Sequence, residues 1–308
     1  MVYTSFPSSN LQNANLLSIG GMILSLLFHF LLTLLSTQTM LSMTEHTLQT
    51  DKLIALRSYL IMIAVAVVAF ILLQIFDLNQ PLFFAINEMS KGLIPDAVAA
   101  HLTELGNGSI VGILALGLTV KYPVIAKRFL LITIIAGILI AGFKQLFADP
   151  RPAGVLAQTD FHIIGDVLKK YSFPSGHTTT AFAMAGFIML TFSSMPLRIF
   201  VLVLAVLAGL SRISVGAHWP EDILAGAALG LLIAYVGSLL SLKPFTLKGS
   251  YSAGAFLALA ALIGNLTAPA DFPEVSTIAD VRLLCAVLAS AAMVYYAARL
   301  GRLYSSKV

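Results

Sequence analysis

The chain has 308 residues, of which 58% are hydrophobic and only 10% are charged, and its formal net charge is +4 at pH 7. Soluble domains carry charges on about a quarter of their residues, so this composition excludes a soluble globular protein. It predicts an all-α polytopic membrane protein. The single cysteine, Cys285, excludes an intrachain disulfide, and its position inside an apolar run predicts a packing role.

Apolar runs near the length of about 20 residues that a helix needs to cross a bilayer follow one another along the chain. The first run has no basic region before it and no small-residue cleavage site after it, so we expect a retained helix rather than a signal peptide. The nine predicted runs are 15–36, 53–76, 105–120, 126–147, 177–195, 197–213, 222–242, 251–269 and 281–298.

The basic residues predict how the runs are oriented. If the runs alternate across the membrane from an outer N-terminus, the inner side has most of the Lys and Arg but only two acids, Glu45 and Asp51. The positive-inside rule favours this orientation, with 148–176 and 212–221 outside, so we expect a bacterial inner-membrane protein whose site faces the periplasm. Anionic headgroups beside the inner residues account for the net charge without nucleic acid. Those residues are Lys52, Arg57, Lys121, Lys127, Arg128, Arg198, Lys243, Lys248, Arg299, Arg302 and Lys307.

The longest polar connection covers residues 77–106. Its segment from Pro81 to Leu105 has the pattern of short amphipathic helices, and we expect breaks at Gly92 and Pro95. A plain loop and an interfacial helix lying along the membrane surface both fit this segment.

The first group of chemically notable residues follows the run 126–147. Lys144 lies near its outer end, and Asp149-Pro150-Arg151-Pro152 comes next. The prolines cannot continue the helix and favour extended conformations before them, so Arg151 is predicted on a stiffened loop. The two cations are either presented together to an anion or simply reach the membrane interface as isolated side chains.

The second group is the stretch Tyr171-Ser-Phe-Pro-Ser-Gly-His177. Pro174 ends what precedes it, and the apolar run that follows predicts a helix beginning at Ser175-Gly176-His177. A helix N-terminus offers free backbone N–H groups to an anion, and His177 adds a group that carries a proton. The pattern indicates phosphate binding with acid catalysis, or else an ordinary helix cap followed by a chance histidine.

The third group combines Ser211-Arg212 with His218-Trp-Pro-Glu-Asp222. Pro220 suits the first position of a helix, which places Asp222 in the first turn and within reach of His218. A carboxylate in this position accepts the proton of one imidazole nitrogen and leaves the other with a free lone pair. Such a pair is typical of an activated histidine nucleophile or base.

Three segments of the chain are Lys144-x6-Arg151-Pro152, Pro174-Ser175-Gly176-His177 and Ser211-Arg212-x5-His218-x3-Asp222. Together they resemble the three-part motif of the type 2 phosphatidic acid phosphatase (PAP2) superfamily, in its membrane-embedded lipid phosphatase branch. The resemblance implies a six-helix core over residues 53–242. It leaves 1–52 as an extra N-terminal transmembrane helix with a cytoplasmic loop, and 243–308 as two extra C-terminal transmembrane helices.

The resemblance also implies roles for the motif residues. His218 attacks phosphorus to give a phosphohistidine, Asp222 orients and activates it, and His177 protonates the leaving oxygen. The nonbridging phosphate oxygens are held by Lys144, Arg151, Ser175, Gly176 and Arg212. We expect neither a metal nor another cofactor, because three cations already face the phosphate and the sequence places no carboxylate cluster with the motif residues.

The implied function is hydrolysis of a phosphate monoester or diphosphate of a membrane lipid, of the undecaprenyl diphosphate, phosphatidylglycerol phosphate or phosphatidic acid type. Soluble haloperoxidase relatives are excluded by the apolar runs. The alternatives are a lipid phosphotransferase of the same superfamily and a non-catalytic phospholipid-binding transporter or scaffold. A binding protein needs the cations but neither the pairing of His218 with Asp222 nor His177, which favours an enzyme.

Overall fold

The structure is a computed structural model that describes residues 45–241, 243, 245–267 and 271–305. Everything described belongs to one compact unit within residues 42–308. Every regular element in the described ranges is a helix. The predicted run 15–36 lies outside them.

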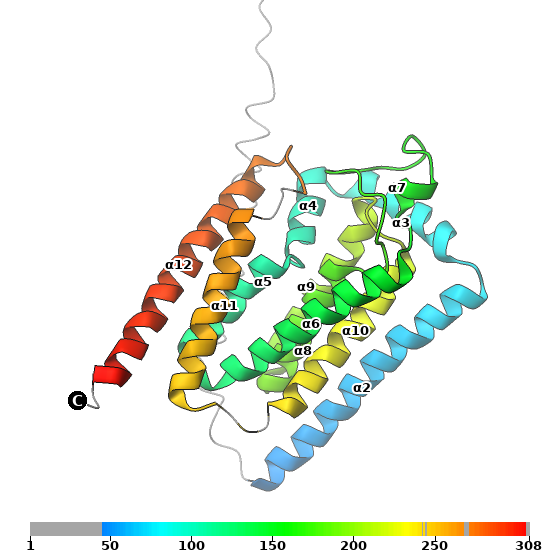
Figure 1. Ribbon diagram of the computed structural model, residues 1–308. Coiled ribbons are helices and arrows are strands. Elements are labelled where there is room, and N and C mark those ends of the chain that lie inside the picture. The colour runs from blue at the N-terminus through cyan, green and yellow to red at the C-terminus, as the bar shows by residue number, and fades with distance from the viewer. Residues whose placement is uncertain (1–44, 242, 244, 268–270, 306–308) are drawn as a thin grey trace, which may run out of the picture. The chain divides into compact units, whose positions relative to one another are not determined.

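A helix coincides with each of the other predicted runs (Figure 1), but the helices at 105–120 and 177–195 are by themselves shorter than the predicted membrane spans. The elements are α2 (Glu45–Ile75), α3 (Asn79–Leu93), α4 (Asp96–Glu104), α5 (Gly108–Lys121), the 3₁₀ turn η1 (Pro123–Ile125), α6 (Ala126–Phe147), α7 (Pro152–Val155), α8 (Gly176–Thr191), α9 (Met195–Ser214), α10 (Pro220–Leu240), α11 (Leu247–Thr267) and α12 (Ser276–Ser305).

Six segments of the described chain are long and apolar enough to cross a membrane, and a seventh is added if α4 and α5, which bend by 54° at their junction, are counted as one span. The helix α8, with 16 residues, is shorter than any of the six. Large apolar side chains cover the outward surfaces, as shown by Val65, Ile138 and Val294, which are 62%, 65% and 68% exposed. Only a bilayer can cover so much apolar surface on so many helices, so this is an integral membrane protein with multiple spans.

The connection at 77–106 is helical, but one expected break was wrong. Helix α3 continues through Gly92 and ends at Leu93, and only the break before Pro95 is present. A helical glycine costs only about 1 kcal/mol relative to alanine, which neighbouring turns can offset. Proline forces the preceding residue out of the helical region, and Ile94 is accordingly extended, with φ −124° and ψ 123°.

The helix α10 lies at the centre of the described bundle and packs against α2, α3, α6, α8 and α9. Its contact with α8 requires a glycine, because a Cβ added at Gly230 would lie 2.4 Å from the carbonyl oxygen of Thr179. Small residues at such crossings let helix backbones approach closely. By contrast, α11 and α12 pack against each other and against α5 (Figure 1).

The connections that contain the three motifs gather at one end of the bundle, at the top of Figure 1. A buried aromatic cluster lies there, in which the Phe83 ring is 5.2 Å from Phe161 and 5.1 Å from Trp219 between centroids. Trp219 also donates its indole N–H to the carbonyl of Pro150 at 3.0 Å. This packing joins α3, the connection before α8 and the start of α10, and it thereby brings the motif segments together.

Candidate active site

The first motif supplies a guanidinium held in place by two backbone carbonyls. Arg151 is extended, with φ −79° and ψ 167°, and precedes the short helix α7, as its flanking prolines predict. Its Nε donates to Lys170 O at 2.9 Å, and its Nη1 donates to Ala217 O at 3.0 Å. The second of these bonds ties the first motif to the third.

Lys144 occupies the last turn of α6, and its Nζ donates to Tyr171 O at 2.6 Å. It lies beside the first residue of α8, because a Cβ added at Gly176 would be 3.9 Å from Lys144 Cε. The first and second motifs are therefore neighbours.

The second motif opens α8 as predicted. Ser175 is the N-cap, and its hydroxyl oxygen accepts from Thr178 N at 3.4 Å and from Thr178 Oγ1 at 2.9 Å. The backbone N–H of Ser175 donates to the carbonyl of Asp222 at 3.1 Å. The hydroxyl therefore serves as a helix cap here, and the N–H links the second motif to the third.

The third motif forms a buried histidine–carboxylate pair. Asp222 lies in the first turn of α10, which begins at Pro220, and its Oδ2 accepts from His218 Nδ1 at 3.1 Å. Both side chains are only 1% exposed. The same oxygen accepts from Trp219 N at 2.8 Å, so Asp222 both caps the helix and orients His218. When Nδ1 donates to the carboxylate, the lone pair lies on Nε2.

A further donor to this carboxylate was missed by the sequence reasoning. The hydroxyl of Ser172, which is fully buried, donates to Asp222 Oδ2 at 2.5 Å and lies 3.4 Å from His218 Nδ1. Ser172 belongs to the stretch singled out before α8. Nothing in its spacing indicated a partner at position 222, because the contact depends on how α8 and α10 pack.

Arg212, in the last turn of α9, differs from Lys144 and Arg151 in its hydrogen bonding. It is 2% exposed, and within the described ranges its Nε and Nη1 have no hydrogen-bond partner. A buried donor without a partner costs about 1–3 kcal/mol, and more when it is charged. Two such nitrogens on one guanidinium indicate a place for an anionic ligand.

Charge accumulates around His218. The groups that interact electrostatically with it are Lys144, Arg151, Arg212 and His177. Burial, together with repulsion by these groups, lowers the pKa of His218 well below its ordinary value. The imidazole is therefore neutral near neutral pH, the form that a nucleophile requires.

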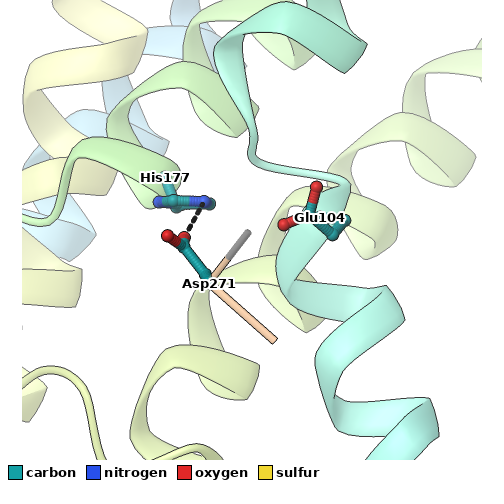
Figure 2. A group of neighbouring side chains, drawn as sticks. All are labelled: Glu104, His177 and Asp271. Carbon is teal, nitrogen blue, oxygen red and sulfur yellow. Dashed lines mark ion pairs between the residues drawn. The ribbon is translucent and has the colours of Figure 1, made fainter. Parts of the chain in front are cut away.

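Two carboxylates that the sequence analysis did not place here lie beside His177 (Figure 2). Asp271, from the connection between α11 and α12, has its Oδ2 3.8 Å from His177 Nε2, and Glu104, at the end of α4, completes the group. The expectation that no carboxylate cluster accompanies the motif residues was therefore wrong. They come from distant parts of the chain, so local spacing could not reveal them.

The ligand atoms of Glu104, His177 and Asp271 lie within 4.8 Å of one another, a spacing compatible with a metal ion. However, Glu104 is already paired with Arg282, whose Nη2 lies 3.1 Å from Oε1 and whose Nε lies 3.3 Å from Oε2. A metal ion would have to compete with this guanidinium and with the cations around His218. The donor set therefore fits an ion-pair network better than a metal centre.

Fold and site together define a polytopic membrane protein with a buried histidine–carboxylate pair close to three basic side chains. The PAP2 superfamily model matches residues 125–244, a region that contains every motif residue. The bacitracin transport permease protein BcrC of Bacillus licheniformis is 31% identical over 166 residues, covering 51% of this chain and 78% of that protein. The chain belongs to the PAP2 superfamily, which confirms the resemblance.

Other relatives match shorter stretches. An undecaprenyl-diphosphatase of Sulfolobus acidocaldarius is 34% identical over 93 residues, or 30% of this chain and 44% of that protein. A lipid A 1-phosphatase of Porphyromonas gingivalis is 35% identical over 106 residues, or 34% of this chain and 21% of that protein. This chain thus spans less than half the length of either relative.

Among solved structures, the crystal structure of Aquifex aeolicus LpxE covers 53% of this chain and 95% of its own, with 27% identity and a TM-score of 0.47.

Proposed function

We propose that this protein is a lipid phosphatase that hydrolyses a phosphate monoester or diphosphate of a membrane lipid through a phosphohistidine. The observation that carries the proposal is Arg212, buried with two nitrogens that lack a partner in the described part of the chain, close to His218. An anion-binding cation beside a neutral, carboxylate-oriented imidazole is what phosphoryl transfer to histidine requires.

In the first step the Nε2 lone pair of His218 attacks phosphorus. A P–N bond forms as the P–O bond to the lipid breaks, and His177 donates a proton to the departing oxygen. Asp222 accepts the hydrogen bond from Nδ1 and stabilises the positive charge that develops on the imidazole. In the second step water attacks the phosphohistidine, gives a proton to His177 and releases inorganic phosphate.

The cations act on the charge that builds on the nonbridging oxygens during both steps. Preorganised donors at such positions usually contribute more to the rate than any other feature of an active site. We assign this role to Lys144, Arg151 and Arg212, and to the Ser175 hydroxyl and the backbone N–H of Gly176.

The substrate class follows from the site and from the relatives. The motif residues are suited to a phosphate, and two of the relatives are an undecaprenyl-diphosphatase and a lipid A 1-phosphatase. We therefore propose a phosphate or diphosphate on a lipid anchor as the substrate. A lipid phosphotransferase would use the same first step and replace water with an acceptor hydroxyl.

We also propose the domain division 1–52, 53–242 and 243–308, with one extra helix before the catalytic core and two after it. In support, the PAP2 match ends before α11, and α11 and α12 pack against α5 rather than around α10.

The direct test is phosphate release by the purified full-length protein in detergent. Candidate substrates are undecaprenyl diphosphate, phosphatidylglycerol phosphate, phosphatidic acid and lipid A, each measured with EDTA and with added magnesium. We expect release from at least one lipid at a rate that EDTA leaves unchanged, because the cationic cluster replaces a metal. A requirement for magnesium would contradict the metal-free mechanism, and lipid binding without any release would favour the scaffold.

The side of the membrane can be tested with a membrane-impermeant maleimide in intact cells. In a Cys285→Ala background, Asp160→Cys lies in the exposed connection before α8, and Lys243→Cys lies in the exposed connection after α10. We propose that the site faces outside, so position 160 should react and position 243 should react only after permeabilisation. The reverse pattern would place the chemistry on the cytoplasmic side.

A further inference from the structure

Asp271 reaches the candidate active site from a part of the chain outside the PAP2 match. It lies between α11 and α12, and its carboxylate faces His177 at 3.8 Å (Figure 2). It also interacts electrostatically with Arg151 and Arg212. The C-terminal helices therefore bring a negative charge to the side of the site where His177 lies.

The backbone that presents Asp271 is fixed. Its carbonyl accepts from Asp166 N at 2.9 Å, and the approach requires Gly165, which has φ +78° and whose added Cβ would lie 2.1 Å from that carbonyl. The next residue, Phe272, is buried in a cluster with Ala99, Ala100, Ile164, Val215, Ala217 and Ile278. A side chain that has to keep a fixed position relative to His177 needs a rigid backbone of this kind.

A buried ion pair holds the C-terminal hairpin, formed by α11 and α12, against α4. Arg282, in the second turn of α12, pairs with Glu104 through two close contacts, and both side chains are nearly buried. Asn107, the N-cap of α5, also donates to Glu104 at 3.2 Å. Because Arg282 compensates the charge of Glu104, Asp271 supplies the anion that faces His177.

The proposed chemistry needs such an anion. His177 must carry a proton to act as an acid, and nearby positive charge disfavours that form. A carboxylate at ion-pair distance opposes this effect. The charged and titratable groups around His177 are Lys144 from α6, Arg151 before α7, Arg212 from α9, His218 before α10, Arg282 from α12, Glu104 from α4 and Asp271.

The geometry points to Asp271 as a positioning residue that faces Nε2 of His177 and stabilises the protonated imidazole, which donates a proton to the leaving oxygen. On this inference, which rests on the proposed function, the hairpin α11–α12 is part of the catalytic machinery rather than an appendage to it.

The test compares Asp271→Asn with Glu274→Gln, which removes the same charge from an exposed position in the same connection. Kinetics are measured across pH on the purified full-length protein with two monoesters, phosphatidic acid and p-nitrophenyl phosphate. We expect Asp271→Asn to lower kcat on phosphatidic acid by roughly tenfold or more with a smaller change in KM. The alkaline limb of its kcat profile should move to lower pH, because the protonated imidazole loses its counter-charge.

The leaving group separates this role from a structural one. Nitrophenolate departs with little need of a proton, so Asp271→Asn should lose much less activity on p-nitrophenyl phosphate, and Asp271→Glu should restore part of the loss on phosphatidic acid. Glu274→Gln should match wild type on both.

Equal losses on both substrates, or a wild-type pH profile in Asp271→Asn, would overturn the inference. If Asp271→Asn does not survive purification, Asp271→Glu is measured on the same two substrates. Equal losses of activity on both substrates would then overturn the inference in the same way. Failure of the wild-type protein to release phosphate from any monoester or diphosphate would instead overturn the proposed function.

Discussion

Replacing His218 with alanine should abolish phosphate release while leaving folding and membrane insertion intact. The imidazole is the only side chain in the proposed mechanism that bonds to phosphorus. Although His218 is buried, Asp222 keeps its hydrogen bonds from Ser172 and Trp219 when the ring is removed. Initial rates on the preferred lipid measure the effect, and base-quenched labelling from a lipid that carries radioactive phosphate tests for the phosphohistidine directly, because its P–N bond is stable in base and hydrolyses in acid. The label should be present in wild type and absent in His218→Ala.

A second histidine–carboxylate pair at the same end of the bundle provides a matched control. His162 Nε2 lies 2.8 Å from Asp96 Oδ1, and this pair is partly exposed. His162→Ala removes the same ring and should retain near wild-type activity. If His218→Ala kept more than about a tenth of the wild-type rate, a loss below roughly 1.4 kcal/mol, His218 would not be the nucleophile.

Replacing Arg212 with methionine should lower kcat by roughly 10²–10³, the usual effect of removing one preorganised donor, about 3 kcal/mol. The same change should not lower the melting temperature in detergent. Methionine fills a similar volume, and it removes a buried charge whose Nε and Nη1 have no partner in the described ranges. The expected result is therefore a stable, nearly inactive protein.

Arg282→Met is the contrasting variant. It breaks the buried pair with Glu104 and leaves that carboxylate without its guanidinium, which typically costs about 3–5 kcal/mol of stability. A clear drop in melting temperature should accompany this change. If Arg212→Met were the less stable of the two, or kept a third of the wild-type rate, Arg212 would have a structural role instead of a role in phosphate binding.

Much of the site could be predicted from local sequence because its geometry is set within one or two helical turns. Pro220 begins α10, so Asp222 must lie in the first turn and within reach of His218. Ser175 has the side chain of a helix cap, and it caps α8. Gly92 and Pro95 were both expected to break the helix, and proline is the stronger helix breaker. Accordingly, α3 continues past Gly92 and ends before Pro95.

Composition alone determined that this is a helical membrane protein, and the resemblance of its three motifs to those of the PAP2 superfamily singled out His177, His218 and Asp222. Only the tertiary structure decided that Ser172 bonds Asp222 and that Asp271 faces His177. These pairs join segments far apart in the chain, and they depend on which apolar helix faces pack together. The apolar runs have similar compositions, so no short sequence pattern shows which helix packs against which. The packing partners depend on how the shapes of many side chains fit together at once.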